Sequence, residues 1–142
     1  MHTVYLDGVF DLFHASHISF MQKVRKHAMK FFEVNEYDIR IVAGVISDKD
    51  VASYKRTPIM TLAQRVKMLQ HCKIVDKVIP KSPLVLTKEF LKQHNIELVY
   101  HADDSKQTEF FKVPIDLGIM QYVPYDQEVS TTAIIQKIKD YY

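Results

Sequence analysis

Short apolar runs alternate along the chain with longer stretches in which apolar residues recur every three or four positions. The short runs have the length of buried β-strands and are bounded by charged or turn-forming residues. They predict strands at residues 3–6, 39–46, 75–79, 97–100 and 120–123. The longer stretches have helical periodicity, and candidate N-cap residues open several of them. They predict helices at residues 17–32, 61–72, 87–94, 114–117 and 132–140.

This alternation predicts the α/β fold class: a Rossmann-like, doubly wound, parallel five-stranded sheet with helices on both faces. A chain of 142 residues without an internal repeat, linker or low-complexity tract is expected to form a single domain over residues 1–142. Ligands of such sheets bind at the carboxyl ends of the strands. Residues that follow the predicted strands are therefore the first candidates for a functional site.

The composition narrows the possible functions. A formal net charge of +2 is too small to indicate nucleic-acid binding. No apolar stretch approaches the roughly 18 residues needed to cross a bilayer, and no signal peptide precedes the first strand. The single cysteine, Cys72, fits a reducing compartment, so a cytoplasmic protein without a membrane segment is expected. The chain has only 3 glycines, which counts against a nucleotide-binding loop.

Two histidines mark the turn between the first predicted strand and the first predicted helix. His14 and His17 are three positions apart in the segment DGVFDLFHASH, residues 7–17. A helix N-terminus there is an anion site, because free amides and the helix dipole face the ligand. Two imidazoles can bind phosphate oxygens and stabilise charge as a phosphoanhydride breaks. The alternative is one loop histidine beside an ordinary helix N-terminal residue.

Hydroxyl and cationic side chains supply further candidates. Ser130, Thr131 and Thr132 open the last predicted helix and, with its free amides, form a second candidate phosphate site. The alternative is an ordinary serine N-cap. Lys55 and Arg65 follow the second predicted strand and are expected to be free to neutralise phosphate, unless both are solvated surface cations.

The fourth predicted strand is followed by the segment HADD, residues 101–104. Its histidine and aspartates could bind a metal ion, but no second cluster with ligand spacing accompanies them, so no metal site on the protein is predicted. All of these features follow strands, and the fold is expected to bring them around one crevice.

These segments resemble the motifs of a known family in the same order along the chain. Residues 7–17 resemble the D-G-[VIC]-[FY]-D and H-x-G-H signatures of the eukaryotic-type choline-phosphate and ethanolamine-phosphate cytidylyltransferases, which are nucleotidyltransferases. The spacing from Lys55 to Arg65 also matches. So do three further segments, QHCKIVDKV at residues 70–78, PLVLTKEF at 83–90 and VSTTAII at 129–135. The resemblance covers nearly the whole chain.

The resemblance implies transfer of CMP from CTP to phosphoethanolamine or phosphocholine, with release of pyrophosphate, for phospholipid precursor synthesis. It implies CTP rather than ATP, magnesium held mostly by phosphates and water, and a homodimer whose contact includes residues 73–78. The implied catalytic residues are His14, His17 and Lys55. The implied nucleotide-binding residues are Gly8, Val9, Phe10, Ser16, Asp103, Ser130, Thr131 and Thr132. The implied contacts of the amino-alcohol phosphate are Asp7, Lys55, Leu84 and His101.

Several positions depart from the motifs of the family. Ser16 stands at the glycine of H-x-G-H, where its hydroxymethyl group is expected to crowd the nucleotide. Tyr125 and Glu128 replace an arginine and a glycine before S-T-T, and Ala102 replaces a glycine of the ethanolamine-type enzymes. Two alternatives therefore stay open. The chain could be a degenerate nucleotide-binding relative with little turnover, or the acceptor could be glycerol-3-phosphate. Leu84 replaces a tryptophan of the choline site, which favours phosphoethanolamine.

Overall fold

The computed structural model describes residues 1–103, 108–126 and 128–142. Its strands are β1 (His2–Gly8), β2 (Ile39–Val45), β3 (Lys77–Pro80), β4 (Leu98–Ala102) and β5 (Met120–Val123). Its α-helices are α1 (Ala15–Phe32), α2 (Asp48–Ala52), α3 (Leu62–Gln70), α4 (Lys88–Gln93), α5 (Lys112–Asp116) and α6 (Thr131–Tyr141). One short 3₁₀ helix, η1 (Glu36–Asp38), precedes β2.

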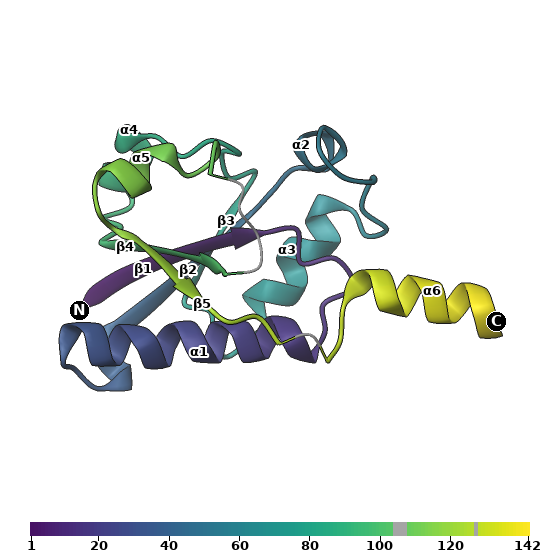
Figure 1. Cartoon of the computed structure of the whole chain (residues 1–142), viewed down its shortest axis with the longest axis horizontal. Helices are drawn as coiled ribbons and strands as arrows, with labels where there is room; N and C mark the ends of the chain where they lie inside the picture. The colour runs from purple at the N-terminus through teal and green to yellow at the C-terminus, as the bar shows by residue number, and fades with distance from the viewer. Residues whose placement is uncertain (104–107, 127) are drawn as a thin grey trace.

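The strands form one parallel sheet in the order β3-β2-β1-β4-β5 (Figure 1). The chain builds the sheet outward from β1 through β2 and β3, and then returns to the other side of β1 with β4 and β5. The strand order therefore switches direction between β1 and β4. In open parallel sheets this switch point is where ligands bind, because the adjacent connections diverge and leave a crevice. The predicted Rossmann-like sheet is confirmed.

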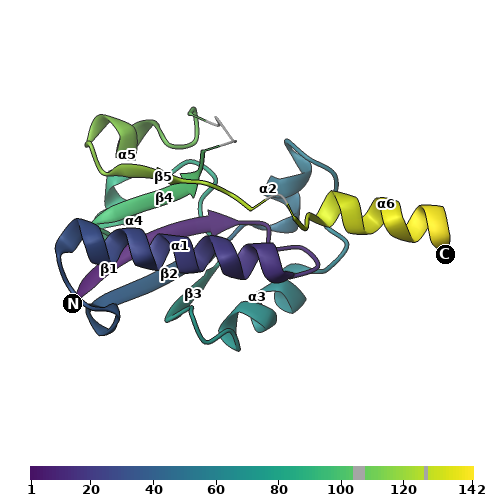
Figure 2. The same ribbon diagram turned by 60° about the horizontal axis from the view of Figure 1, so that its bottom comes forward.

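Helices cover both faces of the sheet, as Figures 1 and 2 show. Alternate residues of each strand point to opposite faces, so β1 contributes to two separate buried clusters. Val4 and Leu6 pack on the side of α1 and α3, together with Met21 of α1. Tyr5 packs on the side of α4 and α5, together with Leu91 of α4. The strands therefore read as continuous apolar runs because both faces are buried.

Several short elements differ from the predicted pattern. The helices α2 and η1 were not predicted, because elements of five and three residues carry too little periodicity to be recognised. The third strand begins at Lys77 rather than at residue 75. Ile74 and Val75 lie in the segment before the strand and pack against the buried cluster on the α1 side. Their apolar side chains therefore resemble strand residues in the sequence. The assignment of residues 1–142 to one domain stays a prediction.

The last helix, α6, projects beyond the carboxyl edge of the sheet (Figure 1). None of its residues is buried. Ser130 is its N-cap, as predicted, and its hydroxyl accepts a hydrogen bond from the backbone N–H of Ala133 at 3.0 Å. The position of α6 therefore depends on polar contacts at its first turn rather than on a packed apolar face.

Candidate active site

A cavity of about 410 Å³ opens at the switch point of the sheet. Its size falls within the range typical of small-molecule sites. Its walls come from the β1–α1 turn with the first part of α1, the end of β2, the segment from α2 to α3, the β3–α4 segment, the end of β4, the segment before α5, and the β5–α6 segment with the start of α6. The predicted residues that line it are Asp7, Gly8, Val9, Phe10, His14, His17, Lys55, Leu84, His101, Ser130, Thr131 and Thr132. The predicted convergence of these segments on one crevice is therefore present in the structure.

The β1–α1 turn adopts a strained backbone to reach this shape. Phe10 and Leu12 have positive φ angles of 54° and 47°, in a region that residues other than glycine rarely occupy. The side chain of Asp11 stabilises the turn through two hydrogen bonds. Its carboxylate accepts hydrogen bonds from the backbone N–H groups of Ile59 at 2.8 Å and Met60 at 2.9 Å. These bonds join the turn to the segment that carries Lys55, so Asp11 positions two walls of the cavity at once.

The two histidines stack on each other at the start of α1, with ring centroids 3.8 Å apart. Nδ1 of His17 accepts a hydrogen bond from the backbone N–H of His14 at 3.1 Å. A nitrogen that accepts carries no proton, so the neutral ring of His17 bears its proton on Nε2. Burial, the neighbouring His14 and the ammonium of Lys55 lower the pKa of His17 to about 3. His17 is therefore a neutral hydrogen-bond donor at physiological pH.

His14 is prepared for a ligand in a different way. Its Nδ1 atom is buried and has no hydrogen-bond partner among the described residues. Burial also lowers the pKa of His14, which favours the neutral ring. A buried polar atom without a partner is costly. A bound ligand that supplied the missing hydrogen bond would relieve this cost.

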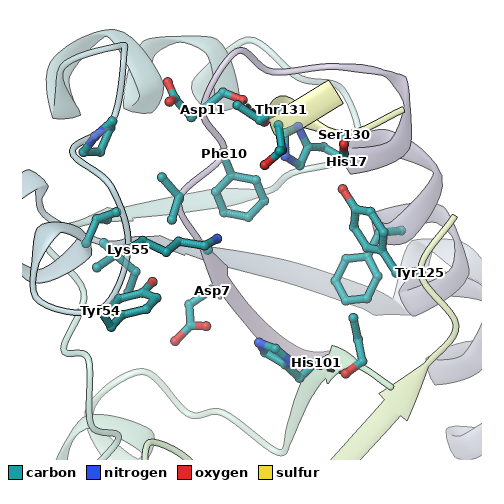
Figure 3. Close-up of a pocket in the computed structure, with 18 of the residues that line it drawn as sticks. Asp7, Phe10, Asp11, His17, Tyr54, Lys55, His101, Tyr125, Ser130 and Thr131 are labelled. Atoms are coloured by element: carbon teal, nitrogen blue, oxygen red, sulfur yellow. Dashed lines mark hydrogen bonds between the residues drawn. The ribbon is translucent and has the colours of Figure 1, made fainter. Parts of the chain in front are cut away.

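Ser130 and Thr131, at the start of α6, lie near His17 (Figure 3). The Thr131 hydroxyl donates a hydrogen bond to the backbone carbonyl of Asp11 at 2.8 Å, so its proton is already used. The Ser130 and Thr132 hydroxyls accept hydrogen bonds, from Ala133 N–H and from the Arg56 guanidinium, so each keeps a proton to donate. Thr131 can contribute its backbone N–H at the helix N-terminus.

Arg65 does not reach the cavity. Its side chain is fully buried, and its guanidinium donates to the backbone carbonyls of Val9, Ile46 and Met60 and to the carboxylate of Asp48. The prediction that Arg65 is free to neutralise phosphate is wrong. A lysine–arginine spacing in sequence cannot show that the second cation is enclosed by carbonyl groups.

Two predicted nucleotide contacts lie outside the cavity lining. Ser16 is 1% exposed and does not line the cavity. Its hydroxyl accepts a hydrogen bond from the backbone N–H of Val129 at 3.1 Å, so it anchors the segment before α6 instead of crowding the nucleotide. Asp103 is exposed and lies outside the cavity lining, and its backbone N–H donates to the carbonyl of Val123. Asp104, the second aspartate of the HADD segment, lies outside the described residues.

The opposite end of the cavity is acidic and aromatic. Asp7 lies there near Tyr54 and His101 (Figure 3). Burial raises the pKa of Asp7 to about 7, and no described residue pairs with its carboxylate. The ring of Phe111 packs 4.8 Å from that of His101. An acidic group among aromatic rings suits a cationic group of a ligand.

Sequence reasoning missed a second set of residues around the cavity. Arg56 lines it next to Lys55, and the aromatic residues Tyr54, Phe110 and Phe111 also contribute to the walls. Tyr125, noted in the sequence only as a departure from the family motif, lines the cavity as well. Arg56 could have been noticed because it adjoins a predicted catalytic lysine. The aromatic side chains give no such signal, because aromatic residues elsewhere in the chain fill the core.

Phosphate-binding groups gathered at a switch point are typical of α/β proteins that bind nucleotides. Comparison with protein families narrows this class: the chain belongs to the cytidylyltransferase-like family, whose model matches residues 5–137.

Curated relatives agree with this assignment. Choline-phosphate cytidylyltransferase 2 of Arabidopsis thaliana is 35% identical, over 97% of this chain and 45% of the relative. Choline-phosphate cytidylyltransferase of Saccharomyces cerevisiae is 34% identical, over 97% of this chain and 32% of the relative. Ethanolamine-phosphate cytidylyltransferase of Dictyostelium discoideum is 30% identical, over 96% of this chain and 38% of the relative. The chain thus spans less than half the length of these relatives.

The fold is also that of a solved structure. The lipopolysaccharide core biosynthesis protein from Thermoplasma volcanium superposes with a TM-score of 0.66, over 89% of this chain and 99% of that chain. At 21% identity, this likeness shows the fold alone. Within the described residues, none of the helices combines the length and the apolar character that a membrane span requires.

Proposed function

We propose that this chain transfers CMP from CTP to an amino-alcohol phosphate, phosphoethanolamine or phosphocholine, and releases pyrophosphate. A phosphate oxygen of the acceptor attacks the α-phosphorus of CTP. The bond from that phosphorus to the oxygen bridging to the β-phosphate breaks, and pyrophosphate leaves with the electron pair. The protein forms no covalent bond in this step, so catalysis rests on positioning and on charge stabilisation. The names of the relatives support both substrates.

The distribution of charge along the cavity carries this proposal. Asp7 lies at one end and suits the cationic head of the acceptor, while His17 and Ser130 lie at the other end and suit phosphates (Figure 3). The ammonium of Lys55 points into the space between the two ends. A cation at this place can contact the acceptor phosphate and the α-phosphate together, which is the role that the resemblance implied for Lys55.

Each imidazole has a defined role in the proposal. His17 donates from Nε2 to a phosphate oxygen, because its Nδ1 is held by the His14 backbone. A neutral donor in a partly buried site stabilises developing negative charge without first losing or gaining a proton. His14, which also lines the cavity, supplies a ring nitrogen to the same phosphates. The amides at the start of α6 bind the leaving pyrophosphate.

Magnesium belongs to the proposal as part of the nucleotide complex. The part of the chain that the structure describes contains no group of three or more metal-binding side chains. The carboxylate of Asp11 is occupied by two backbone N–H groups, and Glu128 lies outside the cavity lining. We therefore expect the phosphates of CTP and water to hold the ion.

The preferred acceptor in this proposal is phosphoethanolamine. Leu84 lines the cavity and presents neither an aromatic face nor a polar group. A quaternary ammonium gains most from aromatic faces, whereas a primary ammonium gains most from hydrogen-bond acceptors such as the Asp7 carboxylate. Glycerol-3-phosphate is less suited, because a neutral diol would leave Asp7 without a cation.

A homodimer and a cytoplasmic location complete the proposal. The support for the dimer is that residues 73–78 resemble the subunit contact of the family. Light scattering on the purified protein tests the dimer, and a mass of one 16.6 kDa chain at micromolar concentration would contradict it.

The decisive experiment measures pyrophosphate release with CTP, magnesium and each acceptor in turn. We expect turnover with phosphoethanolamine to exceed that with phosphocholine and glycerol-3-phosphate. Turnover with glycerol-3-phosphate alone would replace the proposed acceptor, and CTP binding without any turnover would support the degenerate relative. Equal thermal stabilisation by ATP and CTP would contradict the choice of nucleotide.

His17→Ala tests the catalytic centre in the same assay. Loss of one preorganised donor should lower kcat by roughly 10²–10³-fold. His71→Ala is the matched control, because His71 is exposed and lies outside the cavity lining. A His17→Ala variant as active as its parent would show that the stacked histidines are not the catalytic centre.

A further inference from the structure

The cavity contains few fixed positive charges for a ligand as anionic as a nucleoside triphosphate. Among its described lining residues, only Lys55 and Arg56 are lysine or arginine. Burial lowers the pKa of His14 and of His17, so both rings stay neutral near pH 7. Asp7 and Asp11 bring carboxyl groups to the same lining. Arg56 therefore provides half of the fixed cationic charge of the cavity walls.

Arg56 already lies against the candidate phosphate site. Its Nη1 atom donates a hydrogen bond to the Thr132 hydroxyl at 3.3 Å, which joins the α2–α3 segment to α6. This is the only hydrogen bond of the guanidinium within the described part of the chain, so most of its N–H groups remain available. The planar guanidinium can bind two oxygens of one phosphate, which the neighbouring Lys55 cannot do.

The start of α6 shows why a cation is needed at this place. The family has an arginine before its S-T-T motif, and Tyr125 stands at that position in this chain. Tyr125 lines the cavity but carries no positive charge. Helix amides and hydroxyls alone then face the phosphates from this side. Arg56 reaches the same helix turn from the α2–α3 segment. Its position thus supplies the guanidinium that the α6 segment lacks.

We propose that Arg56 is a substrate-binding residue that holds the terminal phosphates of the nucleoside triphosphate against the first turn of α6. The inference rests on the proposed function for the identity of the nucleotide. It adds that the triphosphate is gripped from two sides, by Arg56 of the α2–α3 segment and by the α6 N-terminus. The contact with Thr132 holds the guanidinium in place before the nucleotide arrives.

Isothermal titration calorimetry with CTP, CDP and CMP, in magnesium and without acceptor, tests this inference. Arg56→Ala should weaken CTP binding by about tenfold to a hundredfold and leave CMP binding unchanged within about twofold, because CMP lacks the terminal phosphates. Arg56→Lys should recover part of the loss, since it keeps the charge but not the fork. Lys49→Ala is the control, because Lys49 is an exposed cation of α2 outside the cavity lining.

The outcomes separate this inference from the proposed function. Unchanged CTP affinity in Arg56→Ala, or an equal loss for CMP and CTP, would overturn the role of Arg56. The same holds if the parent protein binds CTP no better than CMP. A parent that binds CTP but shows no turnover would contradict the proposed reaction, while the comparison of variants would still decide the role of Arg56. A melting temperature near that of the parent is expected, because Arg56 is exposed.

Discussion

Replacing Arg65 should destabilise the fold rather than weaken phosphate binding. Its guanidinium donates from Nε to the carbonyl of Met60 at 3.1 Å, and from Nη1 to the carbonyls of Val9 at 2.8 Å and Ile46 at 2.9 Å. Nη2 pairs with Asp48. Arg65 thereby ties the β1–α1 turn, the end of β2 and the start of α3 together beneath the cavity.

The expected magnitude follows from which groups lose their partners. In Arg65→Met, three carbonyl groups lose the guanidinium, whereas Asp48 is 46% exposed and can be hydrated again. A buried carbonyl left without a partner costs about 1–3 kcal/mol, and removing one member of a buried charged network costs about 3–5 kcal/mol. We expect a total loss of about 3–5 kcal/mol. For a chain of this length, each kcal/mol lowers Tm by about 3 °C, so Tm should fall by about 10–15 °C.

Urea denaturation and thermal melting followed by circular dichroism measure this loss. Arg65→Lys should lose about half as much stability as Arg65→Met, because the ammonium keeps the charge but cannot reach all three carbonyl groups. Arg40→Met is the matched control, since Arg40 is exposed on β2. An Arg65→Met variant with the parental urea midpoint and a tenfold weaker affinity for CTP would refute the reasoning, because the guanidinium would then act on phosphate.

Three further changes test other contacts of the site. Ser16→Gly should lower stability by about 1 kcal/mol and weaken CTP binding, because the Val129 N–H loses its acceptor; tighter binding by calorimetry would instead support crowding of the nucleotide. Gly44→Ala should lower stability by about 1–3 kcal/mol in urea denaturation, because a Cβ at this position would overlap the Tyr5 hydroxyl. Adding Tyr5→Phe should restore part of the lost stability, and no recovery would show that the clash is elsewhere. Burial raises the pKa of Asp7 to about 7, so KM for phosphoethanolamine should fall as pH rises from about 6 to 8, and the dependence should flatten in Asp7→Asn. The pKa of Asp7 in the folded protein lies above its unfolded value of 3.8. The contribution of Asp7 to the free energy of unfolding is therefore largest below about pH 4 and is lost as the pH rises toward 7.

The sequence by itself determined the sheet and the main candidate groups for phosphate binding. Buried parallel strands must be short and apolar, so they are recognisable between amphipathic helices, and the site follows because strand ends converge at one edge. His14, His17 and Ser130 could be identified for the same reason: each stands at the junction of a strand or loop with a helix N-terminus. Strand ends and helix N-termini depend on neighbouring residues, so the local sequence is enough to predict them.

Tertiary structure decided which polar side chains face the cavity. Arg65 and Arg56 look alike in sequence, but one is enclosed by carbonyl groups and the other lines the cavity and contacts the first turn of α6. Ser16 seemed to oppose the nucleotide, yet its hydroxyl binds Val129, more than a hundred residues away. Hydrogen bonding between distant segments determines these orientations, because a buried donor must find whichever acceptor the fold places beside it. Only the assembled chain shows where that acceptor lies.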